Sequence, residues 1–448
     1  MLVNTLPKEQ LCFGYSSLFR DPAFTRNRES PIHRWVPWIA GFSGQFVEDV
    51  FREFIGHHRG DYRPLVLDPF AGVGTTLVQS MLHGFDTVGF EINPYAALAA
   101  RTKLRAPTLN LMFLDGAIHS IEQAPATWNG NGLPLRLRPT AFRSRIPFFG
   151  SKVEAQVLRL LDLINGIKDP LTADIARMAL GAVMVSVSNY SYEPSLGTRP
   201  GAGKSLIEDA DVPAVLVAKL RQVRNDAAWL QERMLQEGIV ARRELHCQDF
   251  LSLDGQLETG SVDLMVTSPP YMNNYHYVRN TRPQLFWLSL VSDTSDLRQL
   301  EQMNFGKFWQ TVRDSTPIPL NCENPELKRA LALLRNVRSS SGAYGGPGWA
   351  NYVASYFNDC DRFLTILKQV LKRRGVGVVV IGNSIIQGME IQTDRILGDL
   401  AVQKGFTLEG VVEIRSKRVG ASITASTVRR GKRNGARLYE TAVILRKK

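Results

Sequence analysis

The stretch between residues 63 and 91 constrains the fold of this chain more than any other part of the sequence. Residues 63–67 form a short apolar run that predicts a buried strand, and residues 68–76 follow as a glycine-rich turn. A helix is predicted over residues 77–83 and a second strand over residues 85–91. A strand, turn, helix and strand in this order predict two parallel strands joined by a right-handed crossover.

Elements of the same kind return in the C-terminal half of the chain. Strands are predicted over residues 239–245, 262–266, 375–382, 408–414 and 439–445, and helices over residues 352–371 and 396–405. With residues 60–100 they predict one α/β, doubly wound, Rossmann-like sheet that is mostly parallel with an antiparallel last strand. Between them lies an insertion that begins irregularly and then becomes helical, over residues 152–167, 171–187 and 212–237.

The glycine-rich turn has the features of a nucleoside-binding turn. Gly72 and Gly74 allow the backbone to approach a ligand closely, and the following helix offers free N–H groups at its N-terminus. Asp68 ends the first strand and Glu91 ends the second, close to the spacing at which an acid binds ribose hydroxyls. A third glycine and a P-loop lysine are both absent from this turn, so it suits a nucleoside without phosphates.

A second unusual turn follows the predicted strand at residues 262–266. Its sequence is Thr267-Ser268-Pro269-Pro270-Tyr271. Two consecutive prolines lack backbone donors and form a rigid, extended corner, and the carboxyl edge of such a sheet is where ligands bind. The corner offers a hydroxyl, carbonyl oxygens and an aromatic face, which are the groups needed to hold a flat base by its amino group.

The composition indicates which kinds of partner and binding site to expect. The formal charge of +12 favours a polyanionic partner. The four cysteines are far apart and form no Cys-x-x-Cys pair, so we expect neither a disulfide framework nor a bound metal. The sequence has no apolar run of membrane-spanning length and no export signal at its start, which predicts a cytoplasmic protein.

The two turns together resemble a known family. The segment Asp68-Pro69-Phe70-Ala71-Gly72-Val73-Gly74-Thr75-Thr76 and the corner Ser268-Pro269-Pro270-Tyr271 are similar to the two motifs of the S-adenosylmethionine-dependent amino methyltransferases of DNA. A weaker third match is Phe42-Ser43-Gly44, which resembles the Phe-x-Gly cofactor motif of that family. The matches cover the sheet core, about half of the chain.

The resemblance implies a role for each matched residue. The cofactor, S-adenosyl-L-methionine, is expected to bind the residues Phe42, Asp68, Pro69, Phe70, Gly72, Gly74, Thr75, Glu91, Asp249 and Phe250. Among them, Glu91 is expected to bind the ribose hydroxyls and Asp249 the adenine amino group. The target base is expected to bind the catalytic residues Ser268, Pro269, Pro270 and Tyr271.

The same resemblance implies the reaction. A serine oxygen and a proline carbonyl each accept one N–H bond from an exocyclic amine, which frees the nitrogen lone pair to attack a sulfonium methyl. The base must be flipped out of the duplex to reach such a corner. Serine at the first corner position favours cytosine N4 over adenine N6. An RNA amino methyltransferase and a non-catalytic nucleic-acid-binding protein remain as rivals.

The resemblance also divides the chain. Residues 1–104 and 239–448 are expected to form the catalytic domain, with the cofactor half at 35–104 and the catalytic half at 239–448. Residues 105–238 form the helical insertion, a candidate for DNA recognition, and residues 272–350 a variable segment near the base. Expected partners are double-stranded DNA and a cognate restriction or defence protein, in a prokaryotic or phage-encoded, nucleoid-associated system. In this chain the glycine turn precedes the corner, which departs from the commonest order for Ser-Pro-Pro-Tyr.

Four segments are candidates for contact with nucleic acid. The aromatic and polar stretch 189–200 is equally consistent with an ordered surface loop. Residues 273–283 directly follow the corner and are the better candidate for the base pocket. Basic residues cluster in the loop 415–437 and in the insertion, where they are Arg136, Arg138, Arg143 and Arg145.

Overall fold

A computed structural model describes residues 19–448 of this chain, except residues 21, 39–40, 57–61, 129–136, 193–194, 254, 274, 337–345 and 418–436. Its centre is a seven-stranded sheet in the order β10-β11-β7-β6-β1-β2-β5. The strands are β1 Leu65–Asp68, β2 Asp86–Phe90, β5 Arg243–His246, β6 Val262–Thr267, β7 Leu371–Gly382, β10 Phe406–Lys417 and β11 Leu438–Lys447. The predicted α/β, doubly wound sheet is confirmed.

Six strands of the sheet run in one direction, and β11 runs in the opposite direction. β5, β2, β1, β6 and β7 pair in parallel, and β11 runs antiparallel to both β7 and β10. The expected antiparallel last strand is therefore confirmed. The chain winds outward from β1 through β2 to β5, and on the other side from β6 to β7. The carboxyl ends of β1 and β6 thus lie at the switch point, where open α/β sheets bind ligands.

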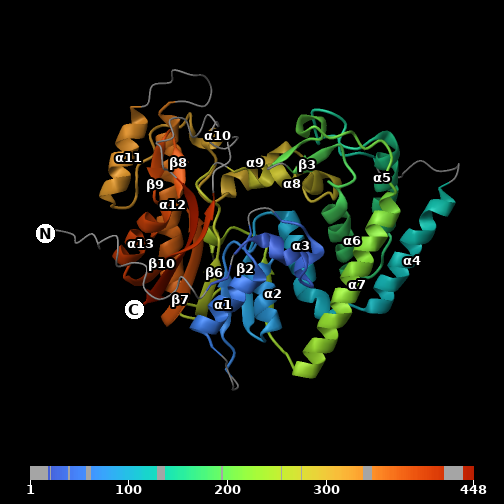
Figure 1. Cartoon of the computed structure of the whole chain (residues 1–448), viewed down its shortest axis with the longest axis horizontal. Coiled ribbons are helices and arrows are strands. Elements are labelled where there is room, and N and C mark those ends of the chain that lie inside the picture. The colour runs from blue at the N-terminus through green and yellow to red at the C-terminus, as the bar shows by residue number, and fades with distance from the viewer. Residues whose placement is uncertain are drawn as a thin grey trace.

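Helices cover both faces of this sheet (Figure 1). On one face α1 Gly44–Phe54 packs against alternate strand residues such as Val66, Leu264 and Val378. The opposite face carries Leu67, Met265 and the helices α12 Gly348–Val370 and α13 Thr393–Gln403. The alternation of buried side chains along each strand produces these two apolar layers.

The insertion is helical from its start, so the irregular beginning that the sequence predicted is wrong. Its helices are α4 Leu111–Thr127, α5 Ser151–Asn165, α6 Pro170–Val183 and α7 Val212–Glu237. Asn110 caps α4, accepting the N–H groups of Met112 and Phe113, but those two side chains are exposed and obscure the apolar pattern. The helices pack with α2 Thr75–Leu82 and α3 Pro94–Arg105 in one continuous apolar core.

Short helices and hairpins surround the carboxyl edge of the sheet. They comprise α8 Tyr277–Trp287, α9 Thr294–Met303, α10 Trp309–Val312, α11 Pro325–Arg335 and the two-stranded sheets β3 Tyr190–Tyr192 with β4 Leu196–Thr198 and β8 Ser384–Ile386 with β9 Met389–Ile391. The 3-10 helices are η1 Phe24–Arg28, η2 His33–Trp35, η3 Ala106–Thr108, η4 Pro200–Ala202 and η5 Phe250–Ser252. None of the described helices combines the length and apolar composition that a bilayer span requires.

Candidate active site

The glycine turn between β1 and α2 requires glycine at two positions. Gly72 and Gly74 have φ angles of 52° and 84°, in the left-handed region that L side chains rarely adopt. A Cβ atom on Gly74 would lie 3.0 Å from the Cβ of Ala100, and one on Gly72 would lie 3.3 Å from Nε1 of Trp38. The turn therefore brings bare backbone against an indole ring.

Glu91 lies directly after β2 and is bound to the same turn. Its Oε2 accepts the N–H of Gly72 at 2.8 Å, and its Oε1 accepts the N–H of Asn93 at 2.7 Å. Burial raises the pKa of this carboxyl to about 7, against the effect of the two N–H donors. Each carboxylate oxygen keeps a further lone pair for a ligand hydroxyl.

A buried hydrogen bond links the glycine turn to the proline corner. Oδ1 of Asp68 accepts the hydroxyl of Thr267 at 2.6 Å and the N–H of Phe70 at 3.1 Å. Burial raises the pKa of Asp68 to about 6. The Thr76 hydroxyl also donates to the Val266 carbonyl at 3.2 Å. The ends of β1 and β6 are thus held together by side chains from both turns.

We expect Thr267→Val to weaken cofactor binding about tenfold. Valine matches the shape of threonine but removes the donor, which leaves a buried carboxyl short of one partner at a cost of about 1–2 kcal/mol. Titration calorimetry with S-adenosylmethionine measures the change. Thr87→Val is the matched control, because the Thr87 hydroxyl donates to the Val66 carbonyl inside the sheet. Equal affinities for the two variants would contradict the expectation.

The proline corner is held by tyrosines. The Tyr356 hydroxyl donates to the Pro270 carbonyl at 3.0 Å, and the Tyr277 hydroxyl accepts the N–H of Tyr271 at 3.4 Å. Within the corner, the Ser268 hydroxyl donates to the Tyr271 hydroxyl oxygen at 3.4 Å. Burial raises the pKa of Tyr271 well above its ordinary value, so this side chain stays neutral.

One cavity, open to solvent, lies between the two turns. Eight of the residues singled out in the sequence line it, namely Pro69, Phe70, Gly72, Glu91, Asp249, Phe250, Ser268 and Pro270. Asp68, Gly74, Thr75, Pro269 and Tyr271 are absent from the lining. Asp249 caps η5 by accepting the N–H of Leu251 at 2.9 Å. The described residues contain no group of three His, Cys, Asp or Glu side chains placed to hold a metal.

Phe42 does not line this cavity. It is buried beside Phe46, with ring centroids 5.8 Å apart, and its carbonyl accepts the side-chain amide of Asn27 at 3.0 Å. The residue that lies over Gly72 is Trp38, four positions earlier. Ser43 caps α1 by accepting the N–H of Phe46, so this part of the chain serves to start a core helix. No motif in the sequence distinguished Trp38.

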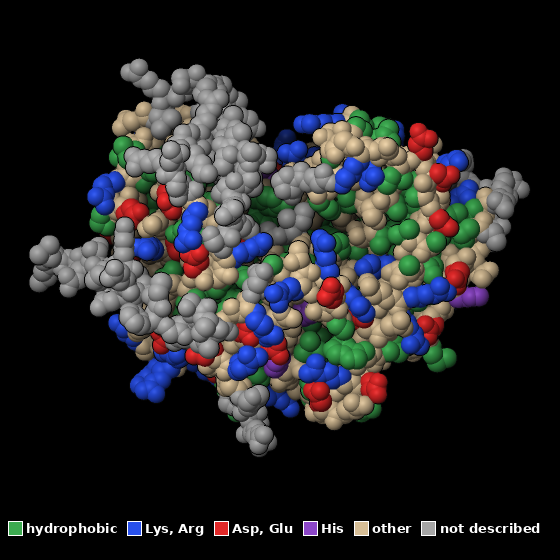
Figure 2. Space-filling view, viewed as in Figure 1, with side chains coloured by type: hydrophobic (Ala, Val, Ile, Leu, Met, Phe, Trp, Pro, Cys, Tyr) green, Lys and Arg blue, Asp and Glu red, His purple; other side chains and the backbone are tan. Residues whose placement is uncertain are grey.

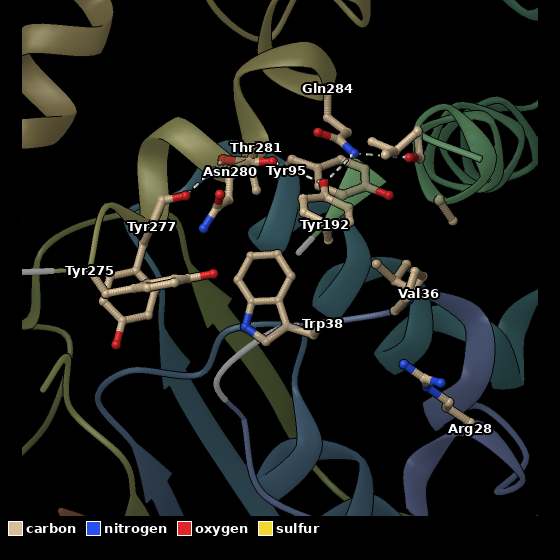
Figure 3. A pocket seen from close by; sticks show the side chains of 14 residues that line it. Arg28, Val36, Trp38, Tyr95, Tyr192, Tyr275, Tyr277, Asn280, Thr281 and Gln284 are labelled. Carbon is tan, nitrogen blue, oxygen red and sulfur yellow. Dashed lines mark hydrogen bonds between the residues drawn. The ribbon is translucent and has the colours of Figure 1, made fainter. Parts of the chain in front are cut away.

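A second cavity, of about 980 Å³, adjoins the first and shares Trp38 and Tyr277 with it. Figure 3 shows its aromatic walls, with Tyr275 and Tyr277 on one side, Trp38 in the middle and Tyr192 near Gln284. The aromatic side chains come from α8 and its approach, from the β3–β4 hairpin, from α3 and from the segment after η2. The sequence-based candidates 189–200 and 273–283 both contribute to this wall.

Two buried amides leave hydrogen-bonding atoms unused in this second cavity. Asn280 accepts the N–H of Leu196 through Oδ1 at 2.9 Å, which fixes the amide orientation, and its Nδ2 has no partner among the described residues. Figure 3 shows that nitrogen directed toward the space beside Tyr277. Gln284 donates through Nε2 to the Gly181 carbonyl at 3.2 Å, and its Oε1 accepts no hydrogen bond from the described residues.

The basic residues that were predicted to contact nucleic acid lie partly within and partly outside the described residues. Arg143 and Arg145 line a third cavity. Arg136 and residues 418–436, which hold most of the basic loop, lie outside the described residues. Their proposed phosphate contacts stay predictions.

Comparison with known proteins identifies distant relatives. Type II methyltransferase M.BsoBI of Geobacillus stearothermophilus is 26% identical over 299 residues, which span 62% of this chain and 57% of that protein. Type II methyltransferase M.AvaI of Nostoc sp. is 23% identical over 87% of this chain and 82% of its own length. Type II methyltransferase M.MvaI of Kocuria varians is 22% identical over 84% and 82%. The chain is thus a distant homologue of type II methyltransferases, although it covers little more than half of M.BsoBI.

The comparisons with family models and with solved structures add no further support for a function. No protein-family model matches the chain. The rRNA methyltransferase aviRa of Streptomyces viridochromogenes superposes with a TM-score of 0.30 and 11% sequence identity, over 92% of this chain and 87% of that one.

Proposed function

We propose that this chain is a DNA methyltransferase that transfers a methyl group from S-adenosylmethionine to the exocyclic N4 of an extruded cytosine. The observation that carries the proposal is one cavity bounded by both the Gly72 turn with Glu91 and the Ser268–Pro270 corner. A nucleoside site and an amine-binding corner are thereby adjacent. The distant relation to type II methyltransferases supports the methyltransferase part of this assignment.

The cavity has groups for each part of the cofactor. Glu91 offers carboxylate lone pairs to two ribose hydroxyls, and Asp249 offers an acceptor for the adenine amino group. Phe250 is buried with its ring 5.3 Å from that of Phe90, edge to face, which provides an apolar wall beside the adenine. When bound, the cofactor supplies an electrophilic sulfonium methyl.

The corner has two acceptors for the amino group. The Pro270 carbonyl already accepts the Tyr356 hydroxyl, so we assign the second acceptor to the Pro269 carbonyl, which lies between the two cavity-lining residues Ser268 and Pro270. Since the Ser268 proton is directed to Tyr271, the serine oxygen presents its lone pairs to a second N–H. Two acceptors at fixed positions draw the amine nitrogen toward tetrahedral geometry and expose its lone pair. The ammonium that forms loses its proton readily, so no side-chain base is required.

The second cavity fits the extruded base. Trp38, Tyr275 and Tyr277 present flat faces on which a base can stack, which is worth about 1–3 kcal/mol per base. The free Nδ2 of Asn280 complements a ring nitrogen that accepts a hydrogen bond. Cytosine and adenine both carry such a nitrogen next to the amino group, whereas guanine carries an N–H there. The choice of cytosine rests on the serine at position 268.

Asn280→Asp is expected to lower kcat/KM for DNA about 10- to 100-fold and to leave cofactor affinity unchanged. The aspartate keeps the acceptor for Leu196 but replaces the donor to the base by an acceptor, which costs about 1–3 kcal/mol. Steady-state methylation assays and calorimetry provide the two readouts. Asn110→Asp is the control, since either residue caps α4. An unchanged kcat/KM would remove Asn280 from the base pocket.

Labelled S-adenosylmethionine, incubated with the protein and either DNA or RNA that is then digested to nucleosides, tests the proposed function. We expect the label in N4-methylcytosine from DNA. Label in N6-methyladenine would overturn the choice of base alone, and label confined to RNA would overturn the substrate. Absence of label from both would favour a non-catalytic nucleic-acid-binding protein.

We further propose the setting and division of labour that the resemblance implies. Residues 1–104 and 239–448 act as the catalytic domain, and the insertion 105–238 with the segment 272–350 contacts DNA. The protein is cytoplasmic and nucleoid-associated, prokaryotic or phage-encoded, and acts beside a cognate restriction or defence protein. Expression of this chain in a bacterial host, followed by digestion of the host DNA with restriction nucleases, tests that protection: DNA that every nuclease still cuts would contradict it.

A further inference from the structure

Four arginines surround a third cavity, of about 590 Å³, on the side of α8 away from the aromatic cavity. They are Arg143, Arg145, Arg279 and Arg282, and we call them the arginine quartet. The other lining residues are aromatic, aliphatic, small or hydroxyl-bearing, and no carboxylate is among them. Arg143, Arg145 and Arg279 are exposed, and Arg282 is half-buried.

Among the described residues, Glu301 offsets the charge of the quartet only in part: its carboxyl acts on Arg282 and raises the pKa of that guanidinium, against the effect of burial. None of the four guanidinium groups forms an ion pair with a described carboxylate. Arg282 donates through Nη2 to the Arg143 carbonyl at 3.4 Å, and its buried Nε has no partner. Burial and the neighbouring charge of Arg279 lower the pKa of Arg282. Like charges gathered around a hollow are costly, and a bound anion offsets that cost.

Arginines elsewhere on the insertion behave differently. Arg221 and Arg224 on α7 point to α4, where they pair with Glu122 at 2.7 Å and Asp115 at 3.0 Å. A solvated basic face would show such pairing, or side chains spread apart in water. The quartet instead draws arginines from two segments far apart in sequence into one hollow. The difference in pairing is the reason to assign the quartet a ligand.

The hollow adjoins the aromatic cavity through a shared wall. Asn280 and Gln284 of α8 face the aromatic cavity, while Arg279 and Arg282 of the same helix line the hollow. The β3–β4 hairpin completes the wall, because Leu196 lines the hollow and donates its N–H to Asn280. The Tyr190 hydroxyl accepts the N–H of Arg145 at 2.9 Å, which holds the opposite rim.

The figures place this wall above the carboxyl edge of the sheet. Helix α8 and β3 lie at the top of the molecule, beyond the ends of the parallel strands (Figure 1). In the space-filling view a hollowed region opens at the upper centre, with Lys and Arg side chains on its rim (Figure 2). Because Arg279 and Arg282 belong to α8, the quartet lies beside the wall of the cavity in which the proposed function places a base.

We infer that the arginine quartet binds phosphodiester groups of duplex DNA beside the extruded nucleotide. The inference rests on the proposed function and deepens it, because a base in the aromatic cavity places its own backbone across the α8 wall. Guanidinium groups match phosphate oxygens in charge and geometry. Such contacts hold the DNA in register and are independent of base sequence.

Salt dependence of DNA binding tests the inference. The variant Arg279→Gln/Arg282→Gln keeps much of the side-chain bulk and removes two charges. Fluorescence anisotropy of a labelled mixed-sequence duplex, between about 50 and 200 mM salt, gives the slope of log K against log salt. We expect its magnitude to fall by about 0.9 for each phosphate that the variant no longer binds, and affinity to fall equally for different sequences. The single variant Arg279→Gln, at an exposed position, should reduce the slope by about half as much as the double variant.

The matched control is Arg373→Gln/Arg374→Gln, which removes the same charge from two exposed arginines near the start of β7, at the opposite edge of the sheet from the hollow. If both double variants gave the same slope, the inference would be overturned. It would also be overturned if the quartet variant bound single-stranded RNA more weakly but bound duplex DNA as the wild type does. Calorimetry with S-adenosylmethionine must give wild-type affinity, which separates weaker phosphate binding from misfolding. If the wild type labels no nucleic acid but its DNA binding still depends on the quartet, the proposed reaction fails and the inference stands.

Discussion

Ser268→Ala is expected to lower the rate of methyl transfer about 100- to 1,000-fold while cofactor affinity stays unchanged. The substitution removes one of two oriented acceptors for the amino group, and a single such group in an active site is worth this much. The side chain lies in the cavity wall near the corner, where its hydroxyl contacts only Tyr271 among the described residues. Single-turnover assays measure transfer, and calorimetry measures the affinity.

A serine at the opposite end of the same strand provides the control for this variant. Ser261 precedes β6, is bonded to the Glu258 carbonyl and is remote from the cavity, so Ser261→Ala should retain full activity. If Ser268→Ala lost cofactor affinity, and its transfer rate fell only as far as that loss explains, our assignment of Ser268 to the base would be wrong. Ser268 would then belong to the cofactor site and not to the base.

Glu91→Gln is expected to weaken cofactor binding about 10- to 100-fold. Both oxygens of Glu91 accept backbone N–H groups, from Gly72 and Asn93, so an amide must turn its NH2 toward one of two donors. That mismatch costs about 1–3 kcal/mol and moves the glycine turn. Titration calorimetry at one pH measures the loss. Asp86→Asn is the control, because Asp86 at the partly buried start of β2 also accepts a backbone N–H, that of Arg242 at 2.8 Å. Equal affinities of the two variants would contradict a role for Glu91.

The pH dependence of binding provides a sharper test of the same carboxyl. Because the pKa of Glu91 is about 7, the acceptor form is lost as the pH falls below 7, and cofactor affinity should fall with it. The raised pKa also means that the free protein loses stability as the pH rises from about 4.5 through 7, since the unfolded chain holds that proton less tightly. Glu91→Gln should flatten the stability profile between about pH 4.5 and 7 and the affinity profile around pH 7.

The sequence predicted the local parts of this protein well. Periodicity located the central strands to within a few residues, because buried parallel strands are short apolar runs. Gly72 and Gly74 adopt left-handed backbone angles, which glycine tolerates better than other residues, so the residue type itself indicated this geometry. The strand at residues 239–245 begins later than predicted, at Arg243, because α7 ends on Gly238 in a left-handed cap.

Contacts between residues far apart in the sequence determined the features that the sequence did not predict. Trp38 lines the cavity that Phe42 was expected to line, because Phe42 is buried against Phe46 of α1. No local sequence pattern predicts this difference. Helix α4 forms because α7 covers its apolar side.

The sequence by itself determined the sheet, the glycine turn and the proline corner, since each depends on backbone preferences of adjacent residues. Only the tertiary structure decided which side chains meet across them. The free amide of Asn280 and the arginine quartet arise where α8 packs against the β3–β4 hairpin, two elements far apart in the chain. Their chemistry depends on unused hydrogen bonds and unpaired charges, which exist only once the surrounding partners have been placed.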